Sequence, residues 1–476
     1  MSEERLAFVT RQVHAGKELG GHDPRVTPIY LTAGFVFDDF AEGADRFAGG
    51  EGYTYTRVGN PTATAVEDRI TDLEGGLGTI FVGSGQAATT VALLALAKAG
   101  DEIAAAEAIY EGTRGLLVDN FSSFGIGARF VADVNDEAQW EAAITPRTKA
   151  VFIESIANPR NEIADIALIA RVAHRHGVPL VVDNTFATPY LVRPFEHGAD
   201  IVIHSTSKFF AGHGAVIGGA IVDGGTFDWA ASGRFAHLTT PQRVRGGHGP
   251  GERSLLDLHG SNAYLVHARD DITMRLGPTP SPFSAFLVAQ GLETLSLRVE
   301  RQSANALRVA EFLATRPEVE SVDYAGLPSN PYFPLAQRYL PLGQGSVFSF
   351  TLRGGEAVAR TFYDSLELFT RMTHLGDVRS LILHPRTTSH THRTAEQLEA
   401  TGVGGGMLRV SIGIEDPADL IRDLERGFRA VAALPGADAE DAGAAPVGAA
   451  SAASAAAGAS AAPADAPTPA ADRAFA

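Results

Sequence analysis

Short apolar segments alternate with longer amphipathic segments from about residue 61 to residue 260. Continuous apolar runs predict buried strands at residues 79–84, 102–108, 149–155, 178–184 and 199–205. Apolar residues at helical spacing predict helices at residues 62–75, 86–100, 136–145 and 163–177. This alternation indicates an α/β domain whose mostly parallel sheet is flanked by helices, with ligands bound beyond the carboxyl ends of the strands.

The remaining segments follow other patterns. Residues 261–436 begin with a long helical stretch, contain apolar strands, and end in a helix, which predicts a smaller C-terminal α+β domain. Residues 1–60 lack the alternation and are predicted to form an extended N-terminal arm. Residues 437–476 contain 21 alanines among Gly, Ser, Pro and Asp, which predicts a disordered tail.

Composition and charge narrow the classes of function. With 39 basic and 56 acidic residues the net charge is −17, and no basic patch is visible, so we expect no nucleic-acid binding. No uncharged apolar run reaches the roughly 18 to 20 residues that cross a bilayer, and no secretory signal is visible, so we expect a cytoplasmic location. The absence of cysteine excludes disulfides, thiolate metal sites and cysteine nucleophiles.

A glycine-rich turn joins the first predicted strand to the next helix. Residues 83–86, Gly-Ser-Gly-Gln, would present backbone N–H groups and a helix N-terminus to a phosphate. The turn also matches the G-x-G-x-x-A dinucleotide fingerprint, and Glu107 lies 22 residues after Gly85, where an acid that binds ribose is expected. The turn therefore predicts phosphate binding and leaves an NAD-dependent oxidoreductase open.

Two ionisable residues follow the last two predicted strands. Asp183 needs a cation or hydrogen-bond donors after its apolar strand, and Lys208, one of four lysines, becomes a nucleophile and base when burial lowers its pKa. Pyridoxal phosphate requires a lysine for a Schiff base, an acid beside the pyridine nitrogen, and a phosphate cup, to which Ser205 and Ser207 would add hydroxyls. An exposed lysine and a capping aspartate are the alternative.

With these motifs and the segment YTYTRVGNPT, the sequence resembles the Cys/Met-metabolism pyridoxal-phosphate enzymes of fold type I over nearly all of residues 5–436. The resemblance implies that Lys208 forms the Schiff base and that Asp183 pairs with the ring nitrogen. It also implies that the phosphate is bound by the residues Gly85, Gln86, Ser205 and Ser207.

Four further residues gain roles from this resemblance. It implies that Tyr110 stacks on the pyridine ring and that Asn158 lies near the phenolic oxygen and the substrate. It implies that Tyr55 and Arg57 reach the cofactor phosphate of a neighbouring subunit, in a homotetramer built from dimers. Arg409 would bind the substrate α-carboxylate by a bidentate pair. The residues alone favour a core aromatic residue at Tyr110, and they leave an internal glutamate open as the partner of Arg409.

Within the family, residues 282–301 and 373–392 most resemble O-acetylhomoserine sulfhydrylases. This implies methionine biosynthesis by γ-replacement, with O-acetylhomoserine and sulfide or a thiol as small-molecule substrates. His374 replaces a usual Ser or Asn, and Arg386 replaces a small residue, so the acyl group and the sulfur nucleophile stay open. Cystathionine γ-synthase or γ-lyase is the alternative, whereas Gly112 stands where methionine γ-lyases carry a reactive cysteine.

Three histidines follow in a threonine-rich loop. His384, His390 and His392 lack an added carboxylate, so we expect no metal there.

Overall fold

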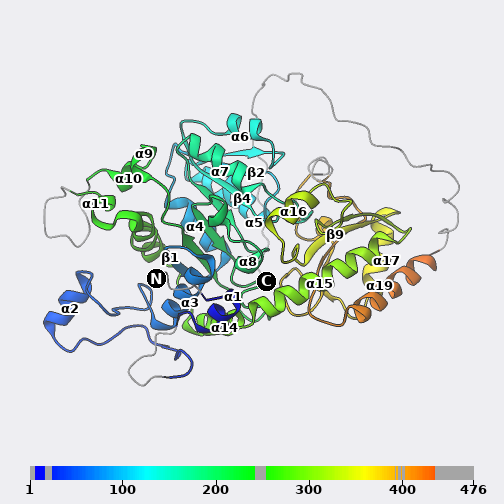
Figure 1. Ribbon diagram of the computed structural model, residues 1–476, viewed down its shortest axis with the longest axis horizontal. Helices are drawn as coiled ribbons and strands as arrows, with labels where there is room; N and C mark the ends of the chain where they lie inside the picture. The colour runs from blue at the N-terminus through cyan, green and yellow to red at the C-terminus, as the bar shows by residue number, and fades with distance from the viewer. Residues whose placement is uncertain are drawn as a thin grey trace, which may run out of the picture. The chain divides into compact units, whose positions relative to one another are not determined.

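The computed structural model describes residues 6–16, 24–241, 253–391, 393–394, 398 and 402–434 (Figure 1). The predicted tail at 437–476 and His392 lie outside these described residues. Two sheets, one of seven strands and one of five, organise the described part of the chain.

The seven-stranded sheet has the order β1-β7-β6-β5-β4-β2-β3. Its strands are β1 (Gly78–Val82), β2 (Glu102–Ala106), β3 (Gly127–Val131), β4 (Thr148–Glu154), β5 (Leu180–Asp183), β6 (Ile201–His204) and β7 (Gly219–Asp223). All neighbouring pairs are parallel except those of β7, which runs antiparallel to both β1 and β6. The predicted α/β architecture with a mostly parallel sheet is therefore confirmed.

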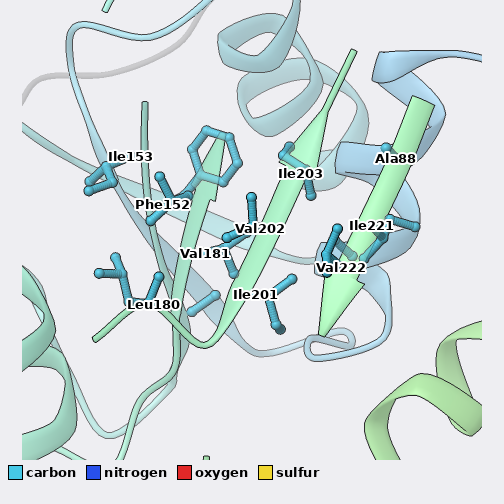
Figure 2. Packing of buried hydrophobic residues seen from close by; sticks show 14 of the residues in the cluster. Ala88, Phe152, Ile153, Leu180, Val181, Ile201, Val202, Ile203, Ile221 and Val222 are labelled. Atoms are coloured by element: carbon cyan, nitrogen blue, oxygen red, sulfur yellow. The ribbon is translucent and has the colours of Figure 1, made fainter. Parts of the chain in front are cut away.

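The four predicted helices of this region are present. They are α3 (Pro61–Glu74), α4 (Gly85–Leu94), α6 (Glu137–Ala143) and α7 (Ile166–Arg175). The central strands are buried on both faces, which explains why they read as continuous apolar runs. Figure 2 shows side chains of β4 to β7 in neighbouring rows, with Ala88 of α4 against β7. Full burial of such a side chain contributes about 1.5–3 kcal/mol.

The five-stranded sheet has the order β10-β11-β12-β9-β8. Its strands are β8 (Val319–Asp323), β9 (Val347–Leu352), β10 (Thr370–Arg371), β11 (Leu381–Leu383) and β12 (Met407–Ser411). Helices α15 (Leu295–Ala314), α17 (Gly355–Ser365) and α19 (Pro417–Ala432) run beside this sheet (Figure 1). Phe362 and Phe428 pack edge to face between α17 and α19, with ring centroids 4.9 Å apart. This region is the predicted smaller α+β part.

The predicted long helical stretch after residue 261 is interrupted. Gly277, with a φ of +76°, ends one helix, Pro278 and Pro280 cannot continue it, and Pro282 begins the next helix. The helices of this stretch are α12 (Ala263–Val266), η4 (His267–Thr273), α13 (Met274–Leu276) and α14 (Pro282–Leu292), before α15.

The arm is poorly buried. Its helix α2 (Phe40–Phe47) has no buried residue, and Phe40 is 93% exposed. The remaining helices of the described residues are α1 (Phe8–His14), α5 (Glu111–Gly115), η1 (Leu116–Phe121), α8 (Thr188–Leu191), η2 (Pro194–His197), α9 (Trp229–Ser232), α10 (Ala236–Thr239), α11 (Leu255–His259), η3 (Gly260–Asn262), α16 (Phe333–Tyr339) and η5 (Pro385–Thr387). In the described ranges, no helix is long and apolar enough to cross a membrane.

Candidate active site

A cavity of about 1160 Å³ opens where the strands of the larger sheet end and reaches β12 of the smaller sheet. Nine of the eleven predicted site residues line it: Gly85, Gln86, Tyr110, Asn158, Asp183, Ser205, Ser207, Lys208 and Arg409. The structure thus brings together side chains that are up to 324 positions apart in the sequence.

The start of α4 forms one wall of the cavity. Ser84 caps the helix because its hydroxyl accepts a hydrogen bond from Ala87 N at 3.1 Å. A Cβ added to Gly85 would lie 2.6 Å from Ser205 Cβ, so only glycine lets the helix start approach Ser205 this closely. The first N–H groups of a helix lack intrahelical acceptors, and this end therefore suits a phosphate.

Backbone groups hold two hydroxyls near this wall, those of Ser207 and Thr185. Ser207 Oγ donates to Gly218 O at 3.2 Å and accepts from Gly218 N at 3.0 Å. Ser205 N donates to Thr185 Oγ1 at 2.8 Å.

Two carboxyl groups stand side by side at the ends of β4 and β5. Glu154 and Asp183 are register partners, and burial raises the pKa of both. The negative charge of Asp183 further raises the pKa of Glu154, whereas two hydrogen bonds from Thr185 lower that of Asp183. Glu154 is held by the backbone N–H groups of Tyr110 at 2.5 Å and Asn158 at 3.4 Å. Sequence reasoning missed Glu154, although it ends a predicted strand just as Asp183 does.

Lys208 lies in the turn after β6. Burial, and then the charge of Arg409, lower the pKa of its amine to about 8. Its Nζ lies 3.2 Å from Nδ1 of His374, a residue that the sequence marked only as a departure from the family pattern. The amine is therefore desolvated but faces an open cavity, as a nucleophile or base requires.

Arg409 is buried in the middle of β12, with only 5% of its surface exposed. It donates to Asn158 Oδ1 at 3.3 Å and to His374 O at 3.4 Å, and burial lowers its pKa to about 10. Among the residues that the structure describes, no carboxylate forms an ion pair with it, so the internal glutamate partner is not found there. Tyr110 is 51% exposed, which excludes a core role.

Tyr55 and Arg57 do not line the cavity of their own chain, as far as the described residues define it. Arg57 donates to Met274 O at 2.6 Å, and its guanidinium lies 5.5 Å from the centre of the Tyr55 ring. Arg386 is likewise absent from the described lining.

The residues on which the dinucleotide and metal alternatives depend contact neighbouring residues instead. Glu107 forms an ion pair with Arg114 at 2.6 Å rather than facing the cavity. His384 contacts Thr387 Oγ1 and Gly405 O, and His390 contacts Ser389 Oγ at 2.9 Å. Within the described residues, no cluster of three or more potential ligands for a metal ion is present.

The cavity fits pyridoxal phosphate. It combines a partly buried lysine amine, a partly buried carboxyl group and a helix start whose glycine leaves room for no side chain. These are the three elements that the cofactor's aldehyde, ring nitrogen and phosphate require.

Comparison with known proteins agrees with this geometry. The family model of Cys/Met metabolism PLP-dependent enzymes matches residues 9–429. An O-acetyl-L-homoserine sulfhydrylase of Corynebacterium glutamicum is 42% identical over 434 residues, covering 90% of this chain and 98% of that protein. A homocysteine/cysteine synthase of Saccharomyces cerevisiae is 40% identical over 446 residues, covering 89% and 98% of the two chains.

A solved structure is also similar. The crystal structure of a Campylobacter jejuni protein assigned as an O-acetylhomoserine (thiol)-lyase matches with a TM-score of 0.84 and 34% identity, over 89% of this chain and all of that one. That structure carries a pyridoxyl-phosphate group on a lysine. The extent of the family match, over a cavity that fits the cofactor, leads to the conclusion that this chain belongs to the Cys/Met-metabolism family of pyridoxal-phosphate-dependent enzymes.

Proposed function

We propose that this protein catalyses γ-replacement on O-acetyl-L-homoserine, in which sulfide or a thiol displaces acetate and homocysteine or its analogue forms. The observation that carries the proposal is Arg409, a buried guanidinium that has no carboxylate ion-pair partner among the described residues and lines the same cavity as the Lys208 amine. Relatives named as O-acetylhomoserine sulfhydrylases support the choice of substrate.

In this proposal, Lys208 and Asp183 hold the aldehyde and the ring nitrogen of pyridoxal phosphate, and Tyr110 and Asn158 flank its ring. The phosphate would be held by Gly85, Gln86, Ser205 and Ser207 of one subunit, and by Tyr55 and Arg57 of its neighbour. When bound, the cofactor supplies an electron-accepting ring that stabilises negative charge on substrate carbons.

The chain's own residues then orient the substrate and move protons. Arg409 binds the α-carboxylate and fixes the α-carbon beside Lys208. Because its pKa is about 8, the free Lys208 amine exists in both protonation states near neutral pH and can take protons from Cα and Cβ and return them. The Cγ–O bond breaks with its electron pair leaving on acetate, and the sulfur nucleophile forms the new Cγ–S bond.

Replacing Lys208 tests the proposal directly. Lys208→Ala is expected to abolish both the yellow, borohydride-reducible chromophore and homocysteine formation, whereas Lys98→Ala, at an exposed lysine, keeps both. Retention of chromophore and turnover in the Lys208 variant would reject the assignment.

Cystathionine γ-synthase or γ-lyase activity would use the same residues. O-acetyl- and O-succinylhomoserine are therefore compared, each with sulfide and with cysteine, and cystathionine cleavage is assayed separately. We expect the acetyl ester with sulfide to be the fastest pair. A homotetramer, a cytoplasmic location and the absence of nucleic-acid binding remain predictions, as do the domain boundaries at residues 60, 260 and 436.

A further inference from the structure

His374 contacts both cationic residues of the cavity. It lies in the segment between β10 and β11, and its ring Nδ1 is 3.2 Å from Lys208 Nζ. Its backbone carbonyl accepts a hydrogen bond from Arg409 at 3.4 Å. His374 thus contacts both the amine that would move protons and the guanidinium that would bind the substrate carboxylate.

The protonation states decide which atom donates. Near neutral pH the Lys208 amine is mostly an ammonium, whereas burial, and then the charge of Lys208, lower the pKa of His374 to about 4. An ammonium group has no acceptor, so Nδ1 must accept from Nζ and the ring proton must be on Nε2. Asp377 raises and Arg409 lowers the pKa of the ring, and the ring remains neutral at physiological pH.

The other ring nitrogen finds no partner. Nε2 of His374 is buried without a hydrogen bond in the part of the chain that the structure describes. Burying an unpaired N–H group lowers the stability of the fold. A contribution to stability therefore does not explain why a histidine stands at position 374. The hydrogen bond between its Nδ1 and Lys208 Nζ is the interaction by which the imidazole contributes to the site.

We propose that His374 is a positioning residue for the reaction: its Nδ1 holds the Lys208 amine, whenever that amine is not bound to the cofactor, beside the substrate carbon that Arg409 presents. The proposal rests on the proposed function. It assigns no proton transfer to the imidazole itself, which stays neutral and acts only as an acceptor. An amine on a four-carbon flexible stem reaches many positions, and one fixed acceptor narrows them.

Two substitutions of similar size distinguish the effect of the hydrogen-bond acceptor from the effect of the volume that the His374 side chain fills. His374→Asn places its Oδ1 at the same branch position as Nδ1 and keeps an acceptor, whereas His374→Leu fills similar space without one. We expect kcat to fall about tenfold in H374L and less than about threefold in H374N, with KM for O-acetylhomoserine nearly unchanged in both. His259→Asn, at an exposed histidine of α11, serves as the control.

A second measurement follows Lys208 without turnover. Pyridoxal phosphate is added to the cofactor-free full chain, and the rate of chromophore formation is measured against pH. At high pH, where the amine is unprotonated in both proteins, we expect H374L to react about tenfold more slowly, because the amine is no longer held in one position. We also expect its pH midpoint to move to lower pH, because the acceptor that stabilises the ammonium is gone. H374N is expected to match the wild type within about threefold.

The outcomes are distinguishable. If H374L behaves like the wild type in both measurements, or if H374N is as impaired as H374L, the acceptor is irrelevant and the proposal is overturned. If H374L does not fold, as judged by thermal unfolding, His374→Ala takes its place in the same comparison. If the wild type forms no homocysteine, the proposed function fails, while the chromophore rate still decides whether His374 positions Lys208.

Discussion

Burial is the first cause of the altered acidity of Lys208, Asp183 and Arg409. Each charged form loses hydration in the cavity, so the pKa values of the two cations fall and that of the carboxyl rises. The consequence is a lysine amine whose pKa of about 8 lets it change protonation near neutral pH.

Asp223, at the end of β7, shows the same effect away from the cavity. Its Oδ1 accepts from Gly225 N at 2.9 Å, while its Oδ2 is buried without a partner in the described residues. Burial, and then the charge of Asp200, raise its pKa from 3.8 to about 7. The folded state therefore binds this proton more tightly than the unfolded state, and stability falls as pH rises from about 4 to about 7.

Asp223→Asn removes this titration. The variant is expected to be more stable than the wild type at pH 8, by up to about 4 kcal/mol, and to gain little at pH 4. Urea unfolding at both pH values measures the difference, with Asp119→Asn, at an exposed aspartate, as the control. An equal effect of Asp223→Asn at both pH values would show that its charge does not limit stability.

At the scale of elements, the start of α4 depends on two glycines. A Cβ at Gly219 of β7 would lie 2.1 Å from Ser84 O, and one at Gly85 would collide with Ser205. The helix start, β7 and the turn after β6 therefore approach backbone to backbone, which places the helix N-terminus in the cavity.

Gly85→Ala is expected to weaken pyridoxal-phosphate binding about tenfold or more, because the helix start and Ser205 must separate. Titration of the cofactor-free chain, followed by absorbance, measures the dissociation constant. Gly404→Ala is the matched control, since a Cβ there meets nothing within 4 Å. Unchanged affinity in Gly85→Ala would place the phosphate elsewhere.

Most elements of the larger sheet were predictable from periodicity alone. The five predicted strands correspond to β1, β2, β4, β5 and β6. We did not predict β3, which is only partly buried, or β7, whose antiparallel course between β1 and β6 follows from tertiary pairing. The region after residue 261 was predicted to begin with one long helical stretch. The prolines in this region indicate that the helix is interrupted.

At the scale of the whole molecule, the two sheets contribute different parts of one cavity. Lys208 follows a strand of the larger sheet, and Arg409 lies on the smaller one. Arg393 and Glu111 form an ion pair at 2.6 Å that joins the loop after β11 to the start of α5. The arm, by contrast, leaves Tyr55 exposed and Arg57 outside its own cavity.

If Tyr55 and Arg57 complete a neighbour's site, two inactive variants should restore each other. Co-expression of Lys208→Ala with Arg57→Ala is expected to recover about a quarter of wild-type activity, because half of the dimers are hybrids with one intact site of two. The control pairs Arg57→Ala with the double variant, in which no site is intact. Equal activity in the two mixtures would contradict a shared site.

The sequence by itself determined which polar residues follow buried strands, because an apolar run and the polar residue after it are neighbours in the chain. Asp183, Lys208 and the glycine turn were identifiable in this way. Only the tertiary structure decided that Glu154 stands beside Asp183, that His374 meets Lys208, and that Arg409 reaches Asn158 without a carboxylate ion-pair partner in the described residues. Periodicity fixes the face on which a side chain lies, but the distance between remote segments depends on how the whole core packs.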